Sequence, residues 1–152
     1  MSALRSERAL DVRVMRRFNA PPGLVFDAWL DPEMIGQWMF GPKVRDEEVV
    51  LMAVDGGVGG SFSFVVRRQG EEVDHVGHYL EIDRPRRLVF TWGVPKYAPD
   101  MAKVRIDIVP LAAGCELTVT HELHPDWADF ASRTEAGWSR MLDALDALVS
   151  PI

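Results

Sequence analysis

One long stretch of helical periodicity, residues 127–149, constrains the fold of this sequence more than any other feature. Its apolar residues recur every three or four positions and form one stripe: Trp127, Phe130, Ala131, Trp138, Met141, Leu142, Leu145, Leu148 and Val149. A helix over this range is about 34 Å long, so an apolar surface of similar length must cover it. We therefore predict that the helix is essential and that a chain truncated at Asp126 does not fold cooperatively.

The preceding part of the sequence supplies that surface, because it alternates apolar and polar residues with the period of two typical of β-strands. Strands are expected near residues 9–18, 44–54, 61–68, 76–82, 88–92, 103–108 and 116–123. Short turns at Gln69-Gly70 and Arg84-Pro85 make neighbouring strands antiparallel. Two short helices are expected near residues 24–29 and 32–38, the second capped by Asp31. This order predicts an α+β fold, in which a curved antiparallel sheet of about seven strands wraps around the C-terminal helix.

Length and charge exclude several classes of protein. The 152 residues are expected to form a single domain, residues 1–152. A formal net charge of −6 argues against a nucleic-acid partner and against docking on anionic membranes. The longest purely apolar run, residues 49–54, is too short for membrane insertion. The single cysteine, Cys115, cannot form an internal disulfide, and no secretory signal is visible, so a cytoplasmic location is expected.

No sequence motif indicates a catalytic centre or a cofactor. The glycine cluster from Gly56 to Gly60 lacks the Lys of a phosphate-binding loop and is followed by a strand, so we interpret it as a hairpin connection. Cys115 shares the parity of Leu117 on its strand and is expected to point inward as a small apolar side chain. We therefore expect no catalytic residue, no cofactor and no metal.

Two histidines lie on the apolar parity of their predicted strands. His78 alternates with Val76 and Leu80, and His121 alternates with apolar residues of the last strand, so both are predicted to face inward. His75 and His124 lie an odd number of residues away and point to the opposite faces, so no two histidines of a strand converge on a metal. Each inward histidine is either a core residue bonded to a carbonyl group or a polar anchor in an apolar ligand pocket.

Several short segments, in their order along the chain, carry a resemblance to a known family. They are Phe18–Pro21, Val25–Trp29, Asp31–Glu33 with Trp38, Val54-Asp55 with Gly59-Gly60, Gly77–Ile82, Arg87–Trp92, Gly114, Leu117–Glu122 and Gly137-Trp138. Together they resemble the START-like (SRPBCC) superfamily and, within it, the branch related to activators of the heat-shock protein 90 ATPase. The resemblance covers nearly the whole chain and implies the helix-grip fold. The chain departs from the branch at Gly57, usually basic, and at Met39, where a second tryptophan is common.

The resemblance implies a cavity between the curved sheet and the C-terminal helix, opening beside the two short helices. The residues expected to line it are Trp29, Trp38, Phe62, Phe64, His78, Leu80, Phe90, Trp92, Ile106, His121, Gly137, Trp138 and Met141. The leading hypothesis is a module that binds a small hydrophobic molecule, lipid-like or aromatic, in this cavity.

Two alternatives stay open beside that hypothesis. One is a cyclase-type or hydrolase-type enzyme that uses His78, His121 or Tyr79 as acid or base. The other is a stress-related co-chaperone, although the resemblance argues against a chaperone partner because the eukaryotic activator has an additional N-terminal domain. A homodimer also stays open.

Gly137 stands within the predicted helix, where a glycine costs about 1 kcal/mol relative to alanine. We interpret this cost as space needed for a close approach, either by the sheet or by a ligand. A Gly137→Leu substitution separates the two cases. It destabilises the fold if the sheet packs there, and it abolishes binding without loss of stability if a ligand uses the space.

Overall fold

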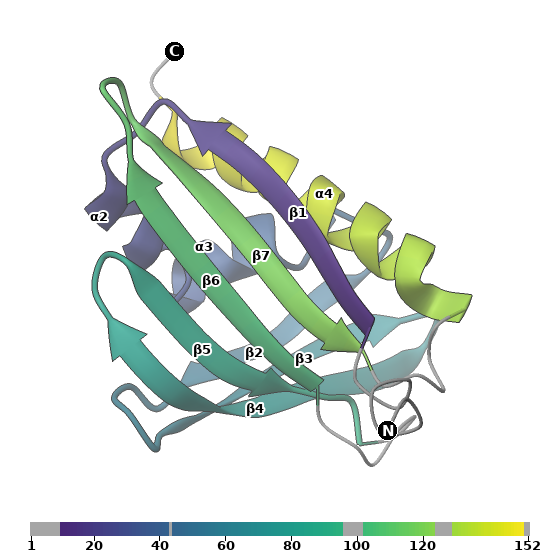
Figure 1. The fold of residues 1–152 in the computed structure, drawn as a ribbon. Helices are drawn as coiled ribbons and strands as arrows, with labels where there is room; N and C mark the ends of the chain where they lie inside the picture. The colour runs from purple at the N-terminus through teal and green to yellow at the C-terminus, as the bar shows by residue number, and fades with distance from the viewer. Residues whose placement is uncertain (1–9, 43, 96–101, 124–128, 151–152) are drawn as a thin grey trace, which may run out of the picture.

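The computed structural model describes residues 10–42, 44–95, 102–123 and 129–150. Figure 1 shows the arrangement of its helices and strands. In chain order they are β1 (Leu10–Phe18), α2 (Pro22–Asp27), α3 (Pro32–Trp38), β2 (Glu48–Val54), β3 (Ser61–Arg68), β4 (Glu71–Asp83), β5 (Arg87–Trp92), β6 (Ala102–Pro110), β7 (Cys115–Leu123) and α4 (Ala131–Val149).

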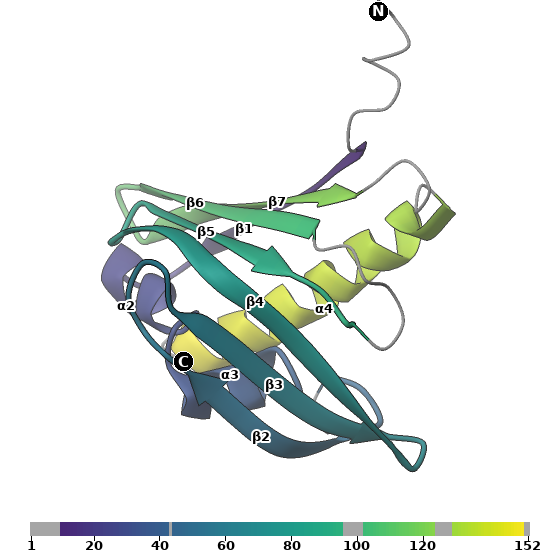
Figure 2. The ribbon, with the colours of Figure 1, turned by 90° about the horizontal axis from the view of Figure 1, so that it is seen from below.

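The strands form one antiparallel sheet in the order β1-β7-β6-β5-β4-β3-β2. Strands β2 to β7 are each paired with the next along the chain, and β1 joins the sheet beside β7, with Phe18 opposite Cys115. Figure 2 shows the sheet curling around α4, with α2 and α3 near the C-terminal end of that helix. The predicted α+β fold is confirmed, including the long C-terminal helix and the two short helices after the first strand.

Helix α4 begins later than the sequence pattern predicts. Phe130 is its N-cap residue and is 38% exposed, and Trp127 lies outside the described residues. The buried residues of α4 are Trp138, Met141, Leu142, Leu145 and Val149. The backbone of α4 packs most closely against β1 and α3. Arg16 of β1 reaches across to α4, where its guanidinium donates to the Asp143 carboxylate at 3.0 Å.

The two short helices follow the expected local signals. Pro32 stands in the first turn of α3, and the Asp31 side chain accepts a hydrogen bond from the Glu33 backbone N–H at 3.0 Å, as predicted. The Trp38 indole N–H, at the end of α3, donates to the Ala28 carbonyl group at 2.9 Å. This buried bond ties the end of α3 to the end of α2.

Strand β4 presents the opposite face from the one predicted. Its buried residues are Val73, His75, Gly77 and Tyr79. His78 is exposed and Leu80 is 48% exposed, so the prediction that these two residues face inward is wrong. The pairing of β4 with β5 shifts between Tyr79 and Glu81, and beyond this irregularity Ile82 packs against the core. The prediction placed His78 and Leu80 on the same face as Ile82 because the residues alternate. The irregularity interrupts this alternation, so the residues before it lie on the other face.

The turns between strands agree with the sequence. Gln69 and Gly70 both have positive φ, 53° and 82°, which is the conformation of a two-residue hairpin turn between β3 and β4. Residues 55–60, with the glycine cluster, connect β2 to β3.

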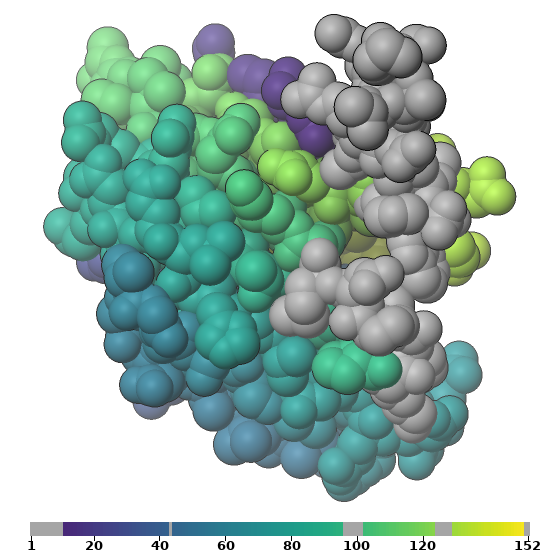
Figure 3. Space-filling view, turned by 60° about the horizontal axis from the view of Figure 1, so that its bottom comes forward, coloured from purple at the N-terminus to yellow at the C-terminus, as the bar shows by residue number. Residues whose placement is uncertain are grey.

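Cys115 is buried, as predicted, and burial raises the pKa of its thiol. In the space-filling view of Figure 3, teal and green side chains from the middle part of the chain cover much of one face of the molecule.

Within the described ranges, no helix is both long and apolar enough to cross a membrane.

Candidate functional site

Aromatic side chains fill the space inside the curved sheet. We call this set the aromatic interior, and it comprises Trp29, Phe62, Phe64, Tyr79, Phe90 and Trp92, together with Met39. The Phe62 and Phe64 rings are stacked with centroids 4.7 Å apart, and Phe62 meets Phe90 edge-on at 5.8 Å. Because β3, β4 and β5 are neighbours, alternate residues of these strands bring their rings together on one face.

The aromatic interior lines a small void of about 10 Å³. A void of this size holds about one water molecule. Seven side chains line it, all of them aromatic or Met, and the polar groups they carry are the Tyr79 hydroxyl and the indole N–H groups of Trp29 and Trp92. Burial raises the pKa of Tyr79 to about 12, so its hydroxyl stays protonated at neutral pH.

The Trp29 indole N–H is a buried donor without an acceptor. Trp29 is 2% exposed, and no described residue accepts a hydrogen bond from its Nε1. Trp38 is different, because its Nε1 donates to a carbonyl group although its ring packs edge-on against Trp29 at 4.6 Å. An unpaired buried donor costs about 1–3 kcal/mol, so this N–H is a feature that a bound acceptor would stabilise.

His121 lies inside the fold as predicted, and its hydrogen bond fixes its tautomer. The Trp138 indole N–H donates to His121 Nδ1 at 3.0 Å. Since an indole nitrogen only donates, His121 Nδ1 carries no proton and the neutral ring is protonated at Nε2. Burial lowers the pKa of His121 to about 4. His121 therefore orients the Trp138 ring, which also lies 5.7 Å from Trp29 and 6.1 Å from Trp92 between centroids.

His75 is the inward-facing histidine of β4, in place of His78. Its Nδ1 lies 3.1 Å from the Phe64 carbonyl oxygen, and this contact makes Nδ1 the protonated nitrogen. Burial lowers the pKa of His75 to about 4, the Phe64 hydrogen bond opposes this change, and the positive charges of Arg68 and Arg45 add to it. The ring packs against both Phe40 and Trp92, with centroid distances of 4.7 and 5.4 Å.

The first two turns of α4 stand away from the core. None of residues 131–137 is buried, and burial begins at Trp138. A Cβ atom built on Gly137 meets nothing within 4 Å among the described residues. The described strands therefore do not approach Gly137, which argues against the first of the two explanations, a close contact with the sheet. The second explanation, that a ligand uses the space beside Gly137, is consistent with this observation.

The structure brings together most of the residues predicted to line a cavity. Those buried on the inner side are Trp29, Trp38, Phe62, Phe64, Phe90, Ile106, His121, Trp138 and Met141. Trp92 is half-buried and packs against the core, and Gly137 is half-buried beside open space. His78 and Leu80 lie on the outer face. For the enzyme alternative, this removes His78 as an interior acid or base.

Met39, Tyr79 and His75 were not among the residues expected to line the cavity, although Tyr79 was a candidate acid or base of the enzyme alternative. Tyr79 and His75 share the parity of Val73, an apolar residue that the predicted strand did not include. Met39 follows the end of α3 and is buried through the position of that helix. The alternation of residues along a strand cannot predict the burial of Met39, because that burial depends on how α3 packs.

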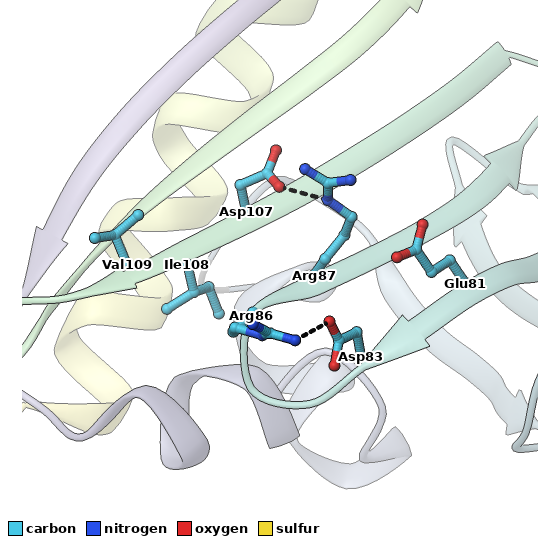
Figure 4. A pocket seen from close by; sticks show the side chains of 7 residues that line it. All are labelled: Glu81, Asp83, Arg86, Arg87, Asp107, Ile108 and Val109. Carbon is cyan, nitrogen blue, oxygen red and sulfur yellow. Dashed lines mark hydrogen bonds and ion pairs between the residues drawn. The ribbon is translucent and has the colours of Figure 1, made fainter.

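A second hollow lies on the outer face of β4, β5 and β6, with a volume of about 320 Å³. Figure 4 shows its charged residues arranged in pairs: Arg86 donates to Asp83 and Arg87 donates to Asp107, each at 2.8 Å. Exposed ion pairs of this kind belong to an ordinary solvated surface. In the described ranges, no group of three or more His, Cys, Asp or Glu side chains could hold a metal ion.

Comparisons with known proteins agree with this geometry. A family model described as "Activator of Hsp90 ATPase homolog 1-like protein" matches residues 19–150. Protein CV1439 from Chromobacterium violaceum is 29% identical, with a TM-score of 0.82, over 93% of this chain and 98% of its own. CalU16 from Micromonospora echinospora is 24% identical, with a TM-score of 0.70, over 94% of this chain and 78% of its own. SA2116 from Staphylococcus aureus, a protein of unknown function, shares the fold at 14% identity, with a TM-score of 0.80, over 94% of this chain and 95% of its own. No curated protein matches the sequence.

Proposed function

Because the chain belongs to the family of Activator of Hsp90 ATPase homolog 1-like proteins, we propose that it binds a small, mainly apolar molecule in the aromatic interior. The molecule is lipid-like or aromatic and carries at least one hydrogen-bond acceptor. The observation that carries this proposal is the Trp29 indole N–H, buried beside the void and without an acceptor in the described residues. A carbonyl or ether oxygen of the ligand would accept this hydrogen bond.

The space beside Gly137, open among the described residues, supports a route into the interior. Trp138 follows Gly137 and contacts Trp29 and Trp92, which both line the void. Trp92 is half-buried, so it is the lining ring that solvent reaches. A ligand larger than one water molecule must displace side chains, and Met39 has the flexible, unbranched side chain that adapts to such a change.

The test uses a neutral apolar dye, Nile red, and two naphthalene derivatives that compete with it. 2-Acetylnaphthalene has a carbonyl acceptor, and 2-ethylnaphthalene has a similar shape without one. The wild-type protein is expected to bind the ketone about threefold to tenfold more tightly, which is the net value of one hydrogen bond. Trp29→Phe removes the donor and should abolish this preference.

Two matched variants make the test specific. Trp38→Phe removes a buried indole N–H that already has a partner, so it should leave the ketone preference intact. Gly137→Leu should keep the stability and weaken Nile red binding, whereas Ala136→Leu, at an exposed neighbouring position of α4, should not. Absence of Nile red binding, or equal affinity of the wild type for both naphthalenes, would contradict the proposal.

A further inference from the structure

A cluster of charged side chains lies beside the aromatic interior, in the segment between α3 and β2 and on the neighbouring end of β3. Its centre is Glu47, whose side chain is completely buried. Arg68 donates to Glu47 Oε1 through Nε at 3.0 Å and through Nη2 at 2.7 Å. Glu47 Oε2 accepts the Gly41 backbone N–H at 2.8 Å. Arg68 and Gly41 therefore already provide hydrogen bonds to both carboxylate oxygens of Glu47.

Arg45 adds a second positive charge beside Glu47, although the charge of Arg68 already balances that of the carboxylate. Its side chain is only 20% exposed, and its Nη1 lies 3.8 Å from Glu47 Oε2. Among the described residues, this is its one ionic contact, and the guanidinium donates no hydrogen bond that would satisfy it. Burial lowers the pKa of Arg45, Glu47 opposes the change, and the nearby charges of Arg68 and Arg140 add to it.

Among the described residues, the charged groups that act electrostatically on Arg45 are one carboxylate, on Glu47, and two further guanidinium groups, on Arg68 and Arg140. The excess is local, because the whole protein has a formal net charge of −6. Holding the guanidinium of Arg45 largely out of water without a close partner is costly unless an anion joins it. A planar guanidinium with free donors is suited to bind a carboxylate.

The cluster is close to the aromatic interior, because Gly41, which donates to Glu47, follows Phe40, whose ring centroid lies 6.1 Å from that of Trp92. Arg45 and Arg68 both act electrostatically on His75, whose ring packs against Trp92 of the void wall. Arg140 stands three residues after Gly137, on the same side of α4 as the open space. An apolar body in the interior and a charged end at the cluster could thus belong to one molecule.

We propose that the ligand is an apolar carboxylate, whose head group is bound by Arg45 and Arg140 while its apolar part occupies the aromatic interior. This inference rests on the proposed function, and it adds the charge of the ligand. Arg68 stays engaged with Glu47 and supports the site without contacting the carboxylate.

The experiment compares 2-naphthoate with 2-naphthylmethanol as competitors of Nile red. The two compounds share their apolar body and differ in charge. The wild type is expected to bind the carboxylate at least about tenfold more tightly, the value of a hydrogen bond to a charged group. Arg45→Gln should remove this preference and leave the affinity for the alcohol unchanged. Arg140→Gln, at an exposed position of α4, should reduce the preference in part.

Arg67→Gln is the matched control. Arg67 precedes Arg68 on β3, faces outward and pairs with Glu48 and Glu72, so its removal changes the net charge equally. If Arg67→Gln weakens naphthoate binding as much as Arg45→Gln, or if the wild type binds both compounds equally, the carboxylate proposal is wrong. If Arg45→Gln does not fold, an unchanged preference in Arg140→Gln overturns it.

The outcomes also separate this inference from the proposed function. Binding of Nile red and of naphthylmethanol without a preference for naphthoate overturns only the charged head group. Failure of Nile red and both naphthalene compounds to bind overturns both.

Discussion

At the scale of single residues, two glycines differ in what a side chain would meet. A Cβ on Gly77 would overlap the Thr91 carbonyl oxygen and lie 2.6 Å from Cζ of Phe62. A Cβ on Gly137 meets nothing within 4 Å in the described part of the chain. We expect Gly77→Ala to lower the free energy of unfolding by about 1–3 kcal/mol. Gly137→Ala should raise it by about 1 kcal/mol, because alanine favours the helix.

Urea unfolding of both variants measures these changes. The two substitutions add the same methyl group, so each serves as the chemical control for the other. A loss of stability in Gly137→Ala would show that α4 packs tightly at this position, and it would remove the open space from the argument for a ligand.

The buried histidines predict a pH dependence of stability. The pKa values of His75 and His121 are about 4 in the folded protein, below the ordinary 6.5. The unfolded chain therefore binds more protons between these values, and stability falls as the pH falls from 6.5 toward 4. Each ring contributes up to about 3 kcal/mol to this loss. His75→Gln should reduce the slope of unfolding free energy against pH in this window.

His78→Gln is the control for that measurement, since it replaces an exposed histidine of the same strand. An equal reduction of the slope in His75→Gln and His78→Gln would contradict the assignment of the effect to the buried ring.

At the scale of elements, α4 supplies a large part of the core. Leu145 is fully buried, and Leu145→Ala should lower the free energy of unfolding by about 2–5 kcal/mol, as other buried leucines do. Leu80→Ala, on the outer face of β4, should cost less than about 1 kcal/mol. Thermal or urea unfolding measures both. A large loss in Leu80→Ala would place that side chain in a contact that the structure does not show.

The elements themselves were largely predictable from the sequence, because each follows from local periodicity and turn residues. The hairpin at Gln69-Gly70 and the Asp31 cap are examples. The inward face of β4 was not predictable, since the irregularity between Tyr79 and Glu81 reverses the parity that the alternation implies. The charged cluster could not be found either. Arg45, Glu47 and Arg68 are brought together by tertiary packing and have no common spacing in the sequence.

At the scale of the whole molecule, charge is distributed unevenly. The formal net charge is −6, whereas guanidinium groups gather beside the aromatic interior around Glu47. An acidic surface repels free anions at a distance. A carboxylate that binds this protein must therefore gain from its apolar part as well as from Arg45. This favours amphipathic ligands over small inorganic anions.

The position of β1 in the sheet has a consequence for biosynthesis. Strands β2 to β7 pair along the chain, but the pairing of Phe18 with Cys115 joins segments about 100 residues apart. At about 5–20 residues per second, a ribosome needs roughly 5–20 s to make the partner of β1 after β1 itself. During this interval β1 has no strand to pair with, and its apolar residues Val12, Val14 and Phe18 are left without their native cover. A nascent chain stalled before β7 should therefore be a much better substrate for chaperones that bind apolar segments than the complete chain.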